Sequence, residues 1–324
     1  MEKNSNKTKW KIATLPRVQA DALISCFLLT YFGEEYYPGI KEAEYFFWVN
    51  IPEGKIPAEL EKEGYILLDM GGGKFDHHAA GGEHGGKCMS QLVAEHLGIH
   101  KKQSIRKLLE YARRDDLLGK GTISNDPIDR AFGLSGLINN LNRTMPDDQL
   151  TVLRTIMPLF VAHYIEERKR SEDFPREFQE KIKNGKVRVV VLKTVRGAMK
   201  MAIIETDEIG MAGYLRAQQG IDIVVQKMSS GHVNIITQQK KMLDLSQIAK
   251  FLRMAEAEEK GVAPSFSEAD LMNAGRIAGA EEWYFDTRAR TIQNGGIRPQ
   301  WTTPTKLSLA MIGEIVKQAA AIKI

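Results

Sequence analysis

Residues 64–86, GYILLDMGGGKFDHHAAGGEHGG, combine carboxylates, imidazoles and flexible glycines in one short stretch. The apolar run at 65–68 ends in Asp69, three glycines follow, and Asp76, His77 and His78 come soon after. Carboxylate oxygens and imidazole nitrogens are ligands of Mn²⁺, Mg²⁺ and Fe²⁺, whereas a structural zinc site usually includes cysteine, which this stretch lacks. The glycines can adopt left-handed turns that bring Asp69 and Asp76 face to face. The pattern therefore predicts a divalent-cation site.

The position of Asp69 supports this interpretation. It ends an apolar, strand-like segment, and ligand sites in open α/β sheets lie beyond the carboxyl ends of the strands. The alternative is a surface loop in which Asp69 forms a turn and the paired histidines have no function.

A second acidic residue, Asp21, lies at the start of a segment with helical spacing of apolar residues, 20–32, which follows a short apolar step at 11–14. It is thus expected at a strand-to-helix junction. As an N-cap it would contribute about 1 kcal/mol. As a ligand it would lie at the same level of the sheet as Asp69, and the residues alone leave both roles open.

Asp115 and Asp116 end a predicted helix, 105–118. Carboxylates near a helix C-terminus oppose the helix dipole, and a bound cation would offset that cost. The alternative is a solvated charge run, compensated by Arg113 and Arg114.

The remaining pattern predicts two domains, as the length of 324 residues also suggests. We expect residues 1–146 to form the first domain, 147–185 a connector that is mostly one long helix, 149–183, and 186–324 the second domain. Further strands are predicted at 45–49, 65–69, 186–193, 199–205, 221–227, 233–238, 282–286 and 291–293, the pair 221–227 and 233–238 forming a hairpin. Further helices are predicted at 89–97, 134–142, 208–219, 245–259 and 306–320.

Composition limits the functional classes. The net charge of +4 neither requires nor excludes a nucleic-acid partner. Cys26 and Cys88 are the two cysteines, which fits a reducing compartment without a disulfide framework. The longest apolar run is too short to span a bilayer, so we expect a cytoplasmic protein with no membrane partner. The apolar helices leave room for a homodimer.

The order of these motifs resembles that of the DHH phosphoesterase superfamily, and most closely the MYG (melanocyte proliferating gene) family of DHH-like exonucleases. The resemblance rests on ATLPRVQADALISCFLL at 13–29, LLDMGGGKFDHH at 67–78, DDLLG at 115–119 and NGGIRPQWTTPTKLSL at 294–309. It implies an α/β fold, with an N-terminal parallel-sheet DHH-type domain and a smaller C-terminal α/β substrate-binding domain.

The resemblance also implies one or two Mn²⁺ or Mg²⁺ ions. Asp21 would match the first-motif aspartate, Asp69 the bridging one, and Asp116, with Asp115 as second choice, the fourth. Asp76, His77 and His78 would form the Asp-His-His motif after which the superfamily is named, and they would be the catalytic residues. Asp76 and His78 would also bind metal, His78 being the leading candidate for contact with a metal or a phosphoryl oxygen and His77 for orienting the site.

Four residues are candidates for binding substrate: His84, Lys87, His232 and Arg298. His232 and Arg298 follow the turn-like segments 228–231 and 294–296, where backbone N–H groups and side chains can clamp a phosphate. Each segment is equally typical of an ordinary hairpin tip.

The function implied is that of a metal-dependent phosphodiesterase, a 3′–5′ exoribonuclease type acting on RNA or short oligonucleotides through an activated water. The family's first motif normally places histidines before its aspartate, but residues 15–19 contain none. The chain would then hold a single ion or recruit another histidine such as His84. The alternatives are a catalytically degenerate relative that binds a nucleotide or nucleic acid, and a small-molecule phosphohydrolase acting on pyrophosphate or a cyclic dinucleotide.

Overall fold

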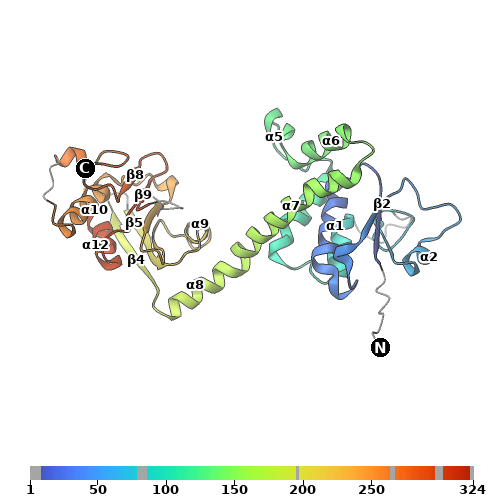
Figure 1. Cartoon of the computed structure of the whole chain (residues 1–324), viewed down its shortest axis with the longest axis horizontal. Helices are drawn as coiled ribbons and strands as arrows, with labels where there is room; N and C mark the ends of the chain where they lie inside the picture. Colours follow the sequence, from blue (N-terminus) through green and yellow to red (C-terminus); the bar gives the residue numbers. More distant parts are fainter. Residues whose placement is uncertain (1–8, 79–85, 195–196, 263–266, 296–301, 322–324) are drawn as a thin grey trace. The chain divides into compact units, whose positions relative to one another are not determined.

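The computed structural model describes residues 9–78, 86–194, 197–262, 267–295 and 302–321 (Figure 1). The chain divides into two compact units, Met1–Ser171 and Glu172–Ile324, and the division falls inside the predicted connector. Both units combine helices with a sheet, so the expected α/β class is confirmed.

The first unit contains a three-stranded parallel sheet in the order β2-β1-β3, formed by β1 (Lys11–Thr14), β2 (Glu44–Phe47) and β3 (Tyr65–Leu67). Successive side chains of the central strand β1 face opposite sides. Ile12 joins the main core with the helices, and Ala13 joins a smaller core with Leu60 and Leu67. Thr14, the last residue of β1, therefore faces the same side as Ile12.

Helix α1 (Ala20–Phe32) is the central helix of this unit and is buried from Ala20 to Leu29. It contacts α3, α4 and α7, which explains why its sequence is apolar almost all round. The helices of this unit that follow are α2 (Pro57–Lys62), α3 (Met89–His96), α4 (Arg106–Leu118), α5 (Pro127–Ala131), α6 (Leu134–Thr144) and α7 (Gln149–Arg168), with short 3₁₀ turns at Gly33–Glu35, Ile40–Glu42 and Gln103–Ile105.

The predicted long helix, 149–183, is interrupted. After α7 the chain forms one π-helical segment, Lys169–Asp173, and then α8 (Phe174–Lys183). Pro175, at the start of α8, has no N–H to donate to the preceding turn, and this favours an irregular segment before it.

The second unit contains a six-stranded sheet in the order β4-β5-β6-β7-β9-β8. Strands β5 and β6 are parallel because α9 (Met211–Gln218) connects them, and the other neighbouring pairs are antiparallel. The predicted hairpin is confirmed as the pair β6 and β7. The strands are β4 (Val187–Thr194), β5 (Gly197–Glu205), β6 (Ile223–Lys227), β7 (Val233–Thr237), β8 (Tyr284–Asp286) and β9 (Thr291–Gln293).

The two faces of this sheet are covered by different helices. Helices α10 (Ser246–Glu259) and α12 (Leu309–Ala319) pack in one core, and α8 and α9 pack in the other. The alternation of buried side chains along β5 follows this division, because Met201 belongs to the first core and Ala202 to the second. A 3₁₀ turn (Gln239–Lys241) and α11 (Glu268–Leu271) complete the described elements.

Both cysteines are free and buried, and burial raises the pKa of Cys26 and of Cys88 to about 12. Thiols in this state are unreactive at neutral pH. Among the described residues, no helix combines the length and the apolar character needed to cross a membrane.

Candidate metal centre

The loop after β3 brings the paired histidines back beside Asp69. Leu68 forms an isolated bridge with Phe75, and the Asp69 N–H donates to the Phe75 carbonyl at 3.3 Å. Asp69 has φ of 59°, a left-handed conformation that aspartate tolerates better than most residues, and Gly71 and Gly72 are also left-handed. The chain thus reverses between Asp69 and Phe75.

His77 lies at the centre of the cluster. Its Nδ1 lies 2.9 Å from Oδ1 of Asp69, its Nε2 lies 3.1 Å from Oδ2 of Asp116, and its side chain is 6% exposed. None of these four buried atoms has a hydrogen-bond partner of acceptable geometry. Unpartnered buried polar atoms are costly, and a ligand bound to all four atoms would remove that cost.

His78 occupies the solvent side of the cluster. Its Nε2 lies 3.5 Å from Oδ2 of Asp69, its side chain is 67% exposed, and its ring centroid lies 3.8 Å from that of His77. The sequence analysis favoured His78 for contact with a metal and His77 for orienting the site, whereas His77 is the imidazole that belongs to both ligand sets. The structure makes His77 the buried one, with a carboxylate at each ring nitrogen.

The side chains form two overlapping sets of metal-type ligands. One is Asp69, His77 and His78, the other is Asp21, His77 and Asp116, and within each set the ligand atoms lie within 4.8 Å of one another. Oxygen and imidazole ligands without thiolate suit Mn²⁺ or Mg²⁺. The unpartnered atoms and the donor set therefore both fit the expected cation.

Asp21 has a structural role that the sequence did not suggest. Its two carboxylate oxygens accept hydrogen bonds from the N–H groups of Met89, at 2.8 Å, and Ser90, at 2.9 Å. It therefore caps α3 rather than its own helix, whose N-cap position is Gln19. Each carboxylate oxygen keeps a second lone pair, so this role is compatible with binding a cation.

Two predicted ligands are engaged elsewhere. The Asp76 carboxylate accepts hydrogen bonds from the N–H groups of Gly72, at 2.8 Å, and His78, at 2.9 Å, and it belongs to neither set. It holds the loop in shape. Asp115 accepts a hydrogen bond from the Ser135 hydroxyl, which also contacts the Tyr111 hydroxyl at 2.6 Å, so Asp115 joins α4 to α6 while Asp116 faces His77.

Burial shapes the electrostatics of the cluster. It raises the pKa of Asp69, an effect opposed by His77 and His78, and it raises the pKa of Asp116, with a further contribution from the charge of Asp21. Negative charge is therefore held here at a cost, which a bound cation would offset.

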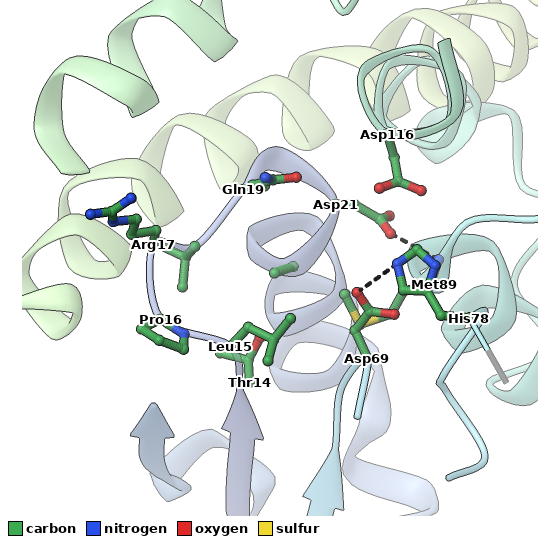
Figure 2. Close-up of a pocket in the computed structure, with 12 residues that line it drawn as sticks. Thr14, Leu15, Pro16, Arg17, Gln19, Asp21, Asp69, His78, Met89 and Asp116 are labelled. Carbon is green, nitrogen blue, oxygen red and sulfur yellow. Dashed lines mark hydrogen bonds and ion pairs between the residues drawn. The ribbon is translucent and has the colours of Figure 1, made fainter. Parts of the chain in front are cut away.

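A cavity of about 180 Å³ opens beside the cluster (Figure 2). Its acidic side presents Asp21, Asp69 and Asp116 together with His78. The rest of its lining comes from the end of β1, the following loop, the start of α1 and α3, namely Thr14, Leu15, Pro16, Arg17, Val18, Gln19, Ala22 and Met89. The stretch 15–19, which contains no histidine, thus lines the cavity throughout.

The loop between β1 and α1 is anchored by residues that sequence reasoning missed. The Val18 N–H donates to Oε1 of Gln149 at 2.9 Å, and Nδ2 of Asn142 donates to the Val18 carbonyl at 2.9 Å. Gln149 and Asn142 are both buried. Thr14 was missed as well, although a threonine ending an apolar strand next to a candidate ligand loop was a signal that could have identified it.

Of the candidate substrate-binding residues, Lys87 and His232 belong neither to the two ligand sets nor to the cavity lining. Lys87 pairs with Glu95 at 2.9 Å. His232 is buried, its Nδ1 3.0 Å from the Ser230 hydroxyl and its Nε2 2.8 Å from the Thr302 carbonyl. These contacts hold the hairpin tip against the C-terminal segment. His84 and Arg298 lie outside the described residues.

No family model, curated protein or solved structure matches the chain. The candidate metal centre therefore depends on its own geometry.

Proposed function

We propose that this protein is a metal-dependent phosphodiesterase that hydrolyses phosphodiester bonds in RNA or short oligonucleotides. The main support is the convergence of Asp21, Asp69, His77 and Asp116, whose buried ligand atoms include four without a hydrogen-bond partner, beside an open cavity. The sequence resemblance to the DHH-like exonucleases supports the same conclusion and favours the 3′–5′ exoribonuclease type.

Asp69, His77, Asp21 and Asp116 would hold Mn²⁺ or Mg²⁺. The ion, when bound, supplies a Lewis acid that lowers the pKa of a water and neutralises charge on a phosphoryl group. The buried carboxylates fix the ligand geometry, and the backbone hydrogen bonds of Asp76 limit movement of the loop that carries both histidines. His78, exposed and lining the cavity, is placed to donate a hydrogen bond to a phosphoryl oxygen.

We assign the second unit to substrate binding. In this proposal its phosphate-contacting candidates remain His232 and Arg298, and Lys87 and His84 serve the same purpose in the first unit. The internal contacts of His232 favour a role in shaping the hairpin tip, with the neighbouring backbone making the contacts to substrate.

A second candidate function is favoured by one observation. Residues 15–19 offer no histidine to the cavity, and the carboxylate of Asp21 already accepts two backbone hydrogen bonds. A site weakened in this way would suit a protein that binds a nucleotide or nucleic acid without hydrolysing it. Such a protein would keep its affinity for the nucleotide or nucleic acid in the presence of chelator. The enzyme would not turn over its substrate under the same conditions.

The test is an assay of the purified chain with Mn²⁺ and labelled oligoribonucleotides, alongside pyrophosphate and a cyclic dinucleotide. We expect a Mn²⁺-dependent product from the oligoribonucleotide that is lost in Asp69→Ala. Asp126→Ala, which removes an exposed cap of α5, is the matched control and should retain activity. Product formed equally by Asp69→Ala, or no product from any substrate, would contradict the proposal.

A further inference from the structure

The hydroxyl of Thr14 is a buried polar group without a partner. Thr14 is 0% exposed, and its Oγ1 has no hydrogen-bond partner. An unpaired buried hydroxyl costs about 1–3 kcal/mol, and valine, which has nearly the same shape, would avoid that cost. The contacts within the described residues therefore do not explain why this position holds threonine.

Thr14 belongs to the lining of the cavity beside the candidate metal centre. Thr14 ends β1 and faces the same side of the sheet as Ile12, the side covered by α1. Figure 2 shows Thr14 at the end of the strand, next to Leu15. Thr14, Leu15 and Asp69 all line the cavity.

The N-terminus of α1 faces the same cavity. Gln19, at the N-cap position, makes no side-chain capping hydrogen bond, and Gln19, Asp21 and Ala22 line the cavity. The first N–H groups of a helix have no partner within the helix, and they carry partial positive charge. Because the Asp21 carboxylate is directed to the N-terminus of α3, it does not cap α1.

The loop that joins these two features is held in place. The backbone of Val18 is fixed on both sides, by Gln149 and by Asn142. Thr14 and the start of α1, which both contribute to the cavity lining, are therefore held in a fixed arrangement, as a preorganised anion site requires.

We propose that Thr14 Oγ1 and the N-terminal N–H groups of α1 form an oxyanion subsite that binds the phosphoryl group of the ligand. The inference rests on the proposed function, since it places the phosphoryl group between the cation held by the carboxylates and the positive end of α1. The ligand class is a phosphate ester or free phosphate. Thr14 donates a hydrogen bond to one of its oxygens and binds no metal.

The experiment is calorimetric titration of the full chain, first with Mn²⁺ alone and then, in saturating Mn²⁺, with inorganic phosphate. We compare the unaltered protein with Thr14→Val, which keeps the shape and removes the donor, and with Thr14→Ser, which keeps the donor. We expect Thr14→Val to weaken phosphate binding about ten- to hundredfold, the effect of one hydrogen bond to a charged group. Thr14→Ser should stay within about threefold of the unaltered protein, and Mn²⁺ affinity should be the same in all three.

The outcomes separate the two proposals. If the unaltered protein binds no Mn²⁺, the proposed function fails and the subsite fails with it. If Mn²⁺ binds but phosphate does not, or if Thr14→Val binds phosphate as tightly as the unaltered protein, only the subsite is overturned. Unchanged phosphate affinity in Thr14→Val is the result expected if the Thr14 hydroxyl only binds a water molecule in the cavity. Thr14→Ala replaces Thr14→Val if circular dichroism shows that the valine variant is unfolded.

Discussion

Nδ1 of His77 lies 2.9 Å from Oδ1 of Asp69, and neither of these buried atoms has a hydrogen-bond partner. The other ring nitrogen faces Asp116 in the same way. One imidazole is therefore flanked by two carboxylates. A cation shared by the three side chains would offset their negative charge.

The two histidines should differ in their effect on metal binding. We expect His77→Ala to weaken Mn²⁺ binding at least about a hundredfold, because it removes the ligand shared by both sets. His78→Asn should leave Mn²⁺ affinity within about tenfold and reduce turnover, because its side chain is mostly exposed and contacts only Asp69 among the carboxylates of the cluster. Calorimetry and turnover measured on the same preparations check this. The reverse order of the two affinities would be inconsistent with the assignment.

Asp69 should destabilise the metal-free protein at neutral pH. Burial raises the pKa of its carboxyl in the folded state. Between the ordinary and the raised pKa the folded state binds more protons than the unfolded state, so stability falls as pH rises through this range. Asp69→Asn removes the charge and suits the left-handed backbone. We therefore expect it to raise the Tm at neutral pH in chelator, with little change at acid pH.

In added Mn²⁺ the unaltered protein should instead be more stable than Asp69→Asn. The unaltered protein gains stability by mass action from a ligand that binds only the folded state, whereas Asp69→Asn gains little. A shift of about 2–4 °C is expected for each kcal/mol in a chain with domains of this size. Thermal unfolding in chelator and in Mn²⁺, over a pH series, measures both effects. An Asp69→Asn variant that is less stable than the parent in chelator at neutral pH would refute this account.

The adjacent aspartates of α4 provide a matched pair. Asp116→Asn should greatly weaken Mn²⁺ binding, because its Oδ2 faces His77. Asp115→Asn should keep Mn²⁺ affinity within about tenfold, because Asp115 accepts a hydrogen bond from Ser135, which an amide oxygen can also accept. Titration with Mn²⁺ distinguishes the two, and equal losses would argue against the choice of Asp116.

Asp21→Ala should destabilise the chain even without metal. It leaves the N–H groups of Met89 and Ser90 without their buried acceptor, and we expect a loss of about 2–4 kcal/mol in the free energy of unfolding. Asp148→Ala, which removes an exposed cap of α7, is the control and should cost about 1 kcal/mol. Urea unfolding in chelator measures both. A loss for Asp21→Ala no larger than that of the control would mean that the cap across helices contributes little.

The elements that carry the cluster could be predicted because each has a strong local signal. The helix predicted at 20–32 is α1 without change, and those predicted at 89–97 and 105–118 are α3 and α4 within one residue at either end. Apolar periodicity and glycine stops decide such elements without knowledge of the rest of the chain. The short helices α2 and α5 were not predicted, because they bury few apolar residues and have no such period.

The roles within the cluster could not be predicted, because they depend on partners far along the sequence. Asp21 caps a helix that begins at Met89, and Val18 is held by Asn142 and Gln149. Likewise, the order of His77 and His78 is decided by which ring the turn directs inward, and adjacent residues in a loop give no indication of this.

The burial of Cys26 and Cys88 makes the chain suitable for spectroscopy. Since thiol reagents attack the thiolate, both native cysteines should remain unlabelled while the protein is folded. A single cysteine introduced at Leu118, which is 59% exposed and lies two residues beyond Asp116, would then carry a nitroxide near the carboxylates. Paramagnetic broadening between that label and bound Mn²⁺ would locate the ion directly in solution, without a crystal and without a substrate.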